Sequence, residues 1–230
     1  MQIERPNTRL DLQAFRSRLM ICAGEDASMF LSVCAQVLGK HPVELYQHRC
    51  YRFWHIDDVL LAWTGIGTAC IEPLLREYCL TGDVERVALV GTAGLSPSSN
   101  CRLGEAHPIA SAFCRACAIN SLGVRHTDAF TPRVTDMQFP EHVTIGSSDF
   151  YYPIQGDEQF DDVDLVDMET AQFYYLCRDI ANQSTDGFDY ISFKGAANEL
   201  GHPEQQEQWT AMVMNAAVTS AYLWLRSPSD

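Results

Sequence analysis

The segment VDLVDMETAQ, residues 163–172, contains Glu169, whose carboxylate is a candidate for a catalytic role. Acidic and apolar residues alternate up to Asp167, which is typical of a strand, and a helical pattern follows Glu169. Ligands of α/β proteins gather where loops leave the carboxyl ends of strands, and a carboxylate held there could stabilise developing positive charge. The alternative is that Glu169 only favours a helix N-terminus. Asp167 would then serve equally well, and nothing would require Met168.

Five further segments follow predicted strands, and three of them are rich in glycine. They are AGED at 23–26, TGIG at 64–67, GTAG at 91–94, SSDFYYP at 147–153 and KGAAN at 194–198. Glycine lets a backbone approach a ligand closely and leaves N–H groups free for an anion. Any tight turn between a strand and a helix can also use glycine, so each segment taken singly is a weak signal.

Predicted strands and predicted helices alternate along the chain, and they determine where these segments lie. Short apolar runs predict strands at residues 19–23, 59–63, 87–90, 143–145 and 190–193. Amphipathic patterns predict helices at residues 28–38, 70–80, 169–182 and 204–225. The stretch 50–63 predicts a hairpin that turns at Asp57 and Asp58 and adds antiparallel strands. We therefore expect an α/β fold, a three-layer α/β/α sandwich around a central mixed sheet, in one domain over residues 1–230.

Composition and charge exclude several classes of protein. The chain has 230 residues, of which 47% are hydrophobic, so it is long enough for one sizeable core. It has no long apolar run and no signal-peptide pattern at its start, so we expect no membrane contact and a cytoplasmic location. The formal net charge is -14 and the 16 basic residues are scattered, which argues against nucleic acid as a partner and favours a small-molecule substrate.

The nine cysteines have core-like neighbours and predict reduced, buried thiols rather than a disulfide framework. Cys114 and Cys117 have the spacing of a redox or zinc pair. No second Cys or His pair with metal spacing lies near them in the sequence, so we expect incidental thiols and no metal site. A redox protein that uses these two thiols is the competing hypothesis.

The ordered set of strand-end segments resembles the nucleoside phosphorylase family, which includes methylthioadenosine/S-adenosylhomocysteine nucleosidase and AMP nucleosidase. The resemblance covers about residues 19–225. Gly24 matches the family's first phosphate-side glycine, and TGIG matches its second strand-end motif. Residues 90–94 are similar to its central Val-Gly-Ser/Thr-x-Gly turn, and residues 147–153 to the base-binding loop of hexameric purine phosphorylases. Residues 166–171 match its Met-Glu motif closely.

The resemblance implies an enzyme that cleaves the N-glycosidic bond of a purine-type nucleoside, with no metal or organic cofactor. Glu169 would be catalytic by binding the ribose hydroxyls, because the sugar becomes cationic as the bond breaks. The remaining implied substrate contacts are Met168 beneath the sugar, Tyr151 and Tyr152 at the base, and Ile66 and Asp149. Gly24, Gly91 and Thr92 would lie on the nucleophile side. The family assembles as dimers or hexamers, so a homo-oligomer is expected, with the hairpin around Phe53 and Trp54 as a possible interface.

Two departures from the family favour water over phosphate as the nucleophile. Hexameric phosphorylases hold phosphate with two arginines, and Ser28 and Leu89 stand at those positions. Phosphate would keep only glycine N–H groups, Thr92 and a residue lent by a neighbouring subunit, for which Arg49 is the candidate. The nucleosidases use water and a glutamate in the first loop as general base. Glu25 is our candidate for that base, and the alternative is that Glu25 and Asp26 are solvated turn acids.

A third departure concerns proton donation to the leaving base. The family has an aspartic acid after the last strand, and KGAAN has Asn198 at that position. An amide can form hydrogen bonds with a purine but cannot transfer a proton, a pattern that suits a 6-oxopurine. Otherwise Glu199 or Asp189 takes the role. The alternatives to a nucleosidase are a phosphorylase with an atypical phosphate site and a non-catalytic nucleoside-binding relative.

Overall fold

The computed structural model describes residues 17–48, 51–79, 84–115, 123–125, 127–135, 137, 139, 141–149, 160–184 and 187–228. Its strands are β1 (Arg18–Ala23), β2 (Val43–His48), β3 (Tyr51–Ile56), β4 (Val59–Thr64), β5 (Arg86–Leu95), β6 (Ala106–Pro108), β7 (Ser111–Cys114), β8 (Ala129–Phe130), β9 (Thr144–Ser147), β10 (Leu165–Asp167) and β11 (Asp189–Glu199). Its helices are α1 (Ala27–Leu38), α2 (Thr68–Cys79), α3 (Thr170–Gln183), the 3-10 turn η4 (Pro203–Gln205) and α4 (Gln206–Arg226).

One sheet of eleven strands organises the described part of the chain. Its main path runs β2-β3-β4-β1-β5-β10-β9-β7-β8, and β11 joins it by pairing with both β5 and β6. β1 is parallel to β4 and β5, and β11 is parallel to β5, whereas β10 runs antiparallel to β5. The sheet is therefore mixed, as the sequence predicts.

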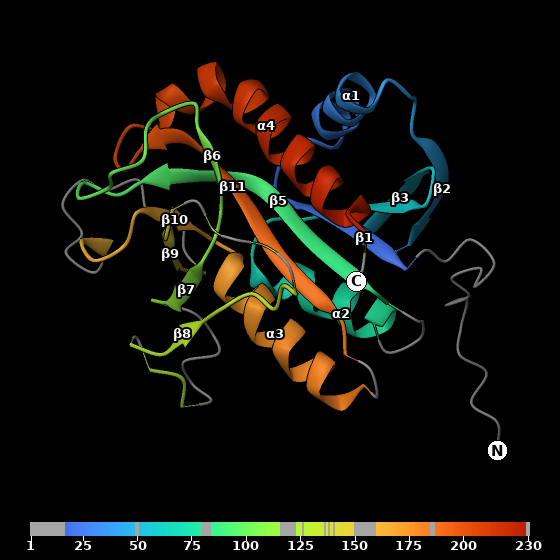
Figure 1. Ribbon diagram of the computed structural model, residues 1–230. Helices are drawn as coiled ribbons and strands as arrows, with labels where there is room; N and C mark the ends of the chain where they lie inside the picture. Colours follow the sequence, from blue (N-terminus) through green and yellow to red (C-terminus); the bar gives the residue numbers. More distant parts are fainter. Residues whose placement is uncertain are drawn as a thin grey trace.

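Two pairs of helices cover the two faces of this sheet (Figure 1). On one face α1 packs against α4, and their side chains, such as Phe30 and Met214, join a core with Met20 and Val90 from the sheet. On the other face α2 packs against α3 in a second core. Each helix buries its apolar stripe against the sheet, which produces the predicted three-layer α/β/α arrangement.

The predicted hairpin joins β3 to β4, and Asp57 lies in its turn with a φ of 51°, a left-handed conformation that Asp tolerates better than most residues. The two central strands are longer than their apolar runs predict: β5 continues to Leu95, and β11 continues to Glu199. GTAG and KGAAN were expected in loops and instead pair with each other inside the sheet. The ladder extends through them because each segment satisfies backbone groups of the other.

Four strands have no counterpart in the sequence prediction: β2, β6, β7 and β8. β8 has two residues and β6 has three, too few for any periodic pattern. β2 lies at the end of the strand path and pairs with β3 alone among the described strands. An edge strand of this kind is held by its neighbour's backbone and needs no continuous apolar run.

The topology brings several chain segments to one end of the sheet. β1, β4, β5 and β11 are mutually parallel, so their carboxyl ends point the same way. β10 arrives antiparallel with Val166 opposite Gly94, so the chain after β10 runs back alongside β5. Met168 and Glu169 consequently lie beside the ends of the parallel strands.

Tyr174 ties α3 to the sheet, and its removal tests this packing. Its buried hydroxyl donates to the Ile109 carbonyl at 2.7 Å and accepts from the Ser192 N–H at 3.1 Å. We expect Tyr174→Phe to lower the free energy of unfolding by about 1–3 kcal/mol, because a buried backbone donor and acceptor lose their partner. Urea denaturation measures this, with Tyr175→Phe as the control on the same helix. Equal stability of the two variants would contradict the prediction.

Candidate active site

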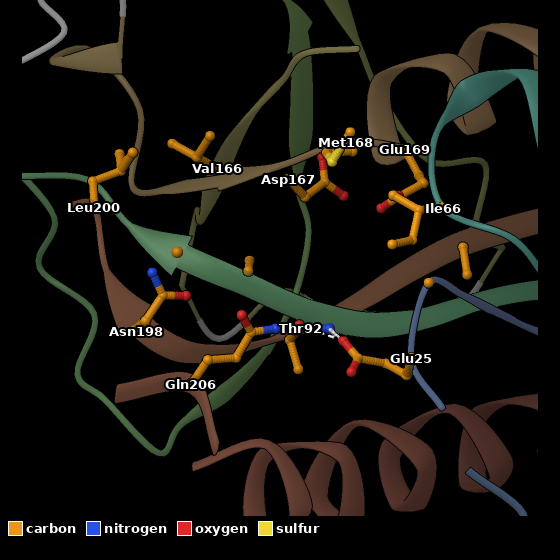
Figure 2. Close-up of a pocket in the computed structure, with 14 residues that line it drawn as sticks. Glu25, Ile66, Thr92, Val166, Asp167, Met168, Glu169, Asn198, Leu200 and Gln206 are labelled. Carbon is orange, nitrogen blue, oxygen red and sulfur yellow. Dashed lines mark hydrogen bonds between the residues drawn. The ribbon is translucent and has the colours of Figure 1, made fainter. Parts of the chain in front are cut away.

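A pocket opens at the strand ends described above (Figure 2). It is lined by residues from β1 and the loop after it, the β4–α2 loop, β5, β10 and the loop after it, β11 and the start of α4. The described lining residues are Ala23, Gly24, Glu25, Ile66, Thr92, Ala93, Gly94, Val166, Asp167, Met168, Glu169, Asn198, Leu200 and Gln206. Seven of the residues proposed from the sequence are thereby brought together: Gly24, Glu25, Ile66, Thr92, Met168, Glu169 and Asn198.

The Glu169 carboxylate faces the pocket and does not cap a helix. Glu169 is the N-cap residue of α3 by position, but its side chain forms no capping hydrogen bond. One carboxylate oxygen accepts the Gly67 N–H at 3.0 Å and the other accepts from Lys194 Nζ at 3.2 Å. The helix N-terminus is served by Asp167, whose Oδ2 accepts the Thr170 N–H at 3.1 Å. The simple helix-terminus interpretation therefore fits Asp167 and not Glu169.

Lys194 lies beneath the pocket and pairs with both acids. Its ammonium is 2.9 Å from Asp167 Oδ2 and 3.2 Å from Glu169 Oε2, with only 1% of the side chain exposed. A side chain at Gly91 would place its Cβ 3.0 Å from Lys194 Nζ, so the glycine leaves the room that the ammonium occupies. Gly91 is not among the described lining residues, and its place in β5 gives it this packing role.

The buried charged groups shift the pKa of Glu169 and the pKa of Lys194. Burial raises the pKa of Glu169, the Lys194 ammonium opposes that rise, and the Asp167 carboxylate adds to it. For Lys194, burial lowers the pKa, but Asp167 and Glu169 outweigh burial and the net shift is upward. The lysine therefore stays charged and holds the two carboxylates in place.

The two acids of the first loop have different roles. Asp26 caps α1 by accepting the Ser28 and Met29 N–H groups at 2.9 and 3.0 Å, and it is exposed. Glu25 reaches into the pocket, where Oε1 accepts hydrogen bonds from the Thr92 hydroxyl and from the Thr92 N–H, the latter at 3.3 Å. The Thr92 donors that phosphate would need thus face a carboxylate. The solvated-acid interpretation fits Asp26, whereas Glu25 belongs to the pocket.

At the end of the pocket away from Glu25 and Glu169, the described lining residues are uncharged. Asn198 and Gln206 bring two amides there, beside the apolar side chains of Val166 and Leu200 (Figure 2). Asn198 lies just after a bulge where the β5–β11 register shifts, and its Nδ2 donates to the Glu199 carbonyl at 2.9 Å. No described residue that lines the pocket is Arg, Lys or His.

Other residues named from the sequence lie elsewhere. Asp149 is not among the described lining residues, Ser28 is at the exposed start of α1, and Leu89 is buried in β5. Tyr151, Tyr152, Arg49 and Cys117 lie outside the described residues, and Cys114 is buried.

Three residues at or beside the pocket were not expected there from the sequence: Lys194, Asp167 and Gln206. Lys194 could have been noticed in the sequence, because it is a charged residue at the end of the apolar strand YISFK, residues 190–194. Nothing in the local pattern distinguishes Gln206 from other polar residues of α4. Its place at the pocket depends on how α4 packs across the sheet.

Among the described residues, no cluster of three or more His, Cys, Asp or Glu side chains is arranged to hold a metal ion. None of the helices in the described ranges is long and apolar enough to cross a bilayer.

Comparison with known proteins shows what the fold is similar to. No family model matches the sequence, and no curated protein matches it significantly. The Arabidopsis thaliana 5′-methylthioadenosine nucleosidase superposes with a TM-score of 0.70 at 11% identity, covering 94% of this chain and 98% of that one. The Colwellia psychrerythraea methylthioadenosine/S-adenosylhomocysteine nucleosidase, solved with adenine, gives 0.67 at 15%, covering 91% and 96%. The Helicobacter pylori futalosine hydrolase gives 0.67 at 10%, covering 91% and 97%. The fold expected from the sequence is confirmed.

Removing the Lys194 ammonium tests the charge cluster. In Lys194→Met the Asp167 and Glu169 carboxylates lose their buried counter-ion, and we expect a loss of about 3–5 kcal/mol in the free energy of unfolding at neutral pH. The Glu169 pKa, already raised by burial, rises further without the lysine. A carboxyl group with a raised folded pKa stabilises the fold below its unfolded pKa and loses that contribution as the pH rises through the folded value.

The deficit of Lys194→Met relative to the wild type should therefore grow from acid to neutral pH. Urea denaturation across that range measures it. Lys40→Met is the matched control, because Lys40 pairs with Asp57 at the surface with 59% of its side chain exposed. A deficit that is the same at every pH would show that Lys194 does not compensate a titrating carboxylate.

Proposed function

We propose that the protein is a nucleosidase that hydrolyses the N-glycosidic bond of a purine-type nucleoside. The observation that supports this most is the Glu169 carboxylate, buried, fixed by Gly67 and Lys194, and directed into a pocket that Glu25 enters from the other side. Of two carboxylates on opposite sides of a pocket, one can stabilise a sugar that becomes cationic. The other can accept the proton that the nucleophile must lose. The structurally similar proteins include nucleosidases, which agrees with the proposal.

Glu169 binds the ribose in this mechanism. Each of its oxygens already accepts one hydrogen bond, from Gly67 or Lys194, and keeps a further acceptor site for a ribose hydroxyl. The carboxylate is held in advance of the reaction, so its charge stabilises the oxocarbenium-like sugar without reorganisation. Met168, which also lines the pocket, packs against the sugar face.

Water is the nucleophile, and Glu25 is its general base. Thr92 holds the Glu25 carboxylate through its hydroxyl and N–H, which leaves the second carboxylate oxygen to accept the proton of a water molecule. The water oxygen bonds to the anomeric carbon while the electrons of the C–N bond depart with the base. Asn198 and Gln206 contact the base edge.

Phosphate is disfavoured as the nucleophile by charge. Glu25, Asp167 and Glu169 line the pocket, and the ammonium of Lys194 is bound to two of them. A phosphate dianion would therefore meet carboxylates and no unpaired cation among the described residues. In a homo-oligomer, a basic residue lent by a neighbouring subunit could change this.

A non-catalytic nucleoside-binding protein is the second candidate, because Asn198 cannot protonate a leaving base. Incubation with a panel of nucleosides separates the two. Release of free base supports the nucleosidase, and saturable binding without any base release supports the binding protein.

The ribose role of Glu169 has a direct test. We expect Glu169→Gln to fold and to lose about 10²–10³-fold in kcat, as when a single electrostatic contact to a transition state is removed. Glu72→Gln, on the surface of α2 and paired with Arg76, is the control that should keep the wild-type rate. Near wild-type kcat/KM in Glu169→Gln would remove this residue from the mechanism.

The nature of the nucleophile is tested by the products. We expect inorganic phosphate to leave the rate of base release unchanged and free ribose to be the sugar product, because the pocket holds carboxylates where the anion would lie. Chromatography of the sugar products measures this. Phosphate-dependent formation of ribose 1-phosphate would make the protein a phosphorylase.

A further inference from the structure

The two ends of the pocket differ in charge, which bears on the leaving base. Glu25 and Glu169 lie at one end, whereas Asn198, Gln206 and Leu200 lie at the other (Figure 2). The Asn198 Nδ2 is engaged by the Glu199 carbonyl, and the amide oxygen has no donor among the described residues. An oxygen acceptor favours a ligand that donates hydrogen bonds or carries positive charge.

The other described titratable residues of β11 and of the chain after it do not line the pocket. Glu199, next to Asn198, has its carboxylate 3.4 Å from Gln205 Nε2 and does not line the pocket. Asp189 begins β11, at the opposite end of that strand, and accepts from the Thr135 hydroxyl at 2.7 Å. The ring of His202 lies 3.0 Å from Glu204 and is likewise not a lining residue.

The carboxylates that do line the pocket are already engaged. Asp167 accepts from the Ser147 and Thr170 hydroxyls, each at 2.5 Å, and pairs with Lys194. Glu169 is bound by Lys194 and Gly67. No described side chain is therefore placed to protonate a base at the Asn198 end.

This arrangement has a consequence for the bond that breaks. When water attacks the anomeric carbon of an ordinary nucleoside, the C–N electron pair leaves the base as an anion unless a proton is supplied. A purine nucleoside that is alkylated on N7, whose lone pair is then used, is already cationic, so the same electron pair converts its base into a neutral leaving group. The water proton passes to Glu25, and no acid is required at the base.

We propose that the preferred substrates are nucleosides with a quaternised, cationic base, of which 7-alkylpurine ribosides are the representative class. This inference rests on the proposed nucleosidase function. The acidic pocket attracts a positively charged ligand, the amide oxygens of Asn198 and Gln206 accept from its edge, and the apolar side chains of Val166 and Leu200 contact its ring.

The test compares 7-methylguanosine with guanosine at mildly acid pH, with spontaneous hydrolysis subtracted. General acid catalysis contributes about 10²–10⁴-fold, so we expect kcat/KM for 7-methylguanosine to exceed that for guanosine by at least about 10²-fold. Asn198→Asp supplies the missing acid and should raise the guanosine rate, so that the ratio of kcat/KM for 7-methylguanosine to kcat/KM for guanosine falls. Asn198→Leu, which removes the amide without adding an acid, is the control and should not raise the guanosine rate.

The outcomes separate this inference from the proposed function. Equal kcat/KM for the two nucleosides in the wild type, or cleavage of guanosine alone, would overturn the cationic-base inference and leave the nucleosidase intact. If neither nucleoside, nor any other in a panel of unmodified nucleosides, releases its base, the nucleosidase proposal fails and this inference fails with it. A guanosine rate that rises equally in Asn198→Leu and Asn198→Asp would show that the amide acts by obstruction rather than by lacking a proton.

Discussion

The ammonium of Lys194, buried between Asp167 and Glu169, is the interaction on which the site depends. Both carboxylates are buried against this ammonium, which opposes the rise in the Glu169 pKa that burial and the Asp167 carboxylate cause. The lysine comes from β11 and the acids from the end of β10 and the residues after it, so the contact also joins two segments that do not pair directly as strands. It fixes the direction of the Glu169 carboxylate, and the proposed chemistry follows from that direction.

The central strands make room for this contact. β5 and β11 continue past their apolar cores through glycine and alanine, and the absence of a side chain at Gly91 opens the space that Lys194 Nζ fills. The same pairing places Thr92 and Asn198 at the pocket, one beside Glu25 and the other at the bulge of β11. The segments 91–94 and 194–198, which the sequence predicts as loops, are thus paired strands beside the charge cluster.

In the proposed reaction, the charge of the pocket bears on both the nucleophile and the leaving group. The carboxylates at one end would disfavour an anionic nucleophile and favour water, whereas the neutral amides at the other end would supply no proton to the departing base. Both features point toward a reaction in which positive charge on the ligand is stabilised throughout. A substrate that brings its own positive charge fits both ends of the pocket.

The helices, the main strands and the β3–β4 hairpin can be predicted from the sequence, because hydrophobic periodicity and turn chemistry are local. The sequence also indicates seven residues that line one pocket, Glu169 among them, since their segments all follow strands. That Asp167 caps α3 while Glu169 faces the pocket, and that Glu25 rather than Asp26 reaches Thr92, depends on the tertiary structure. Adjacent acids have the same local pattern, and what distinguishes them is the partner that a distant strand supplies. Lys194 and Gln206 depend likewise on pairing and packing between elements far apart in the chain, which no local pattern encodes.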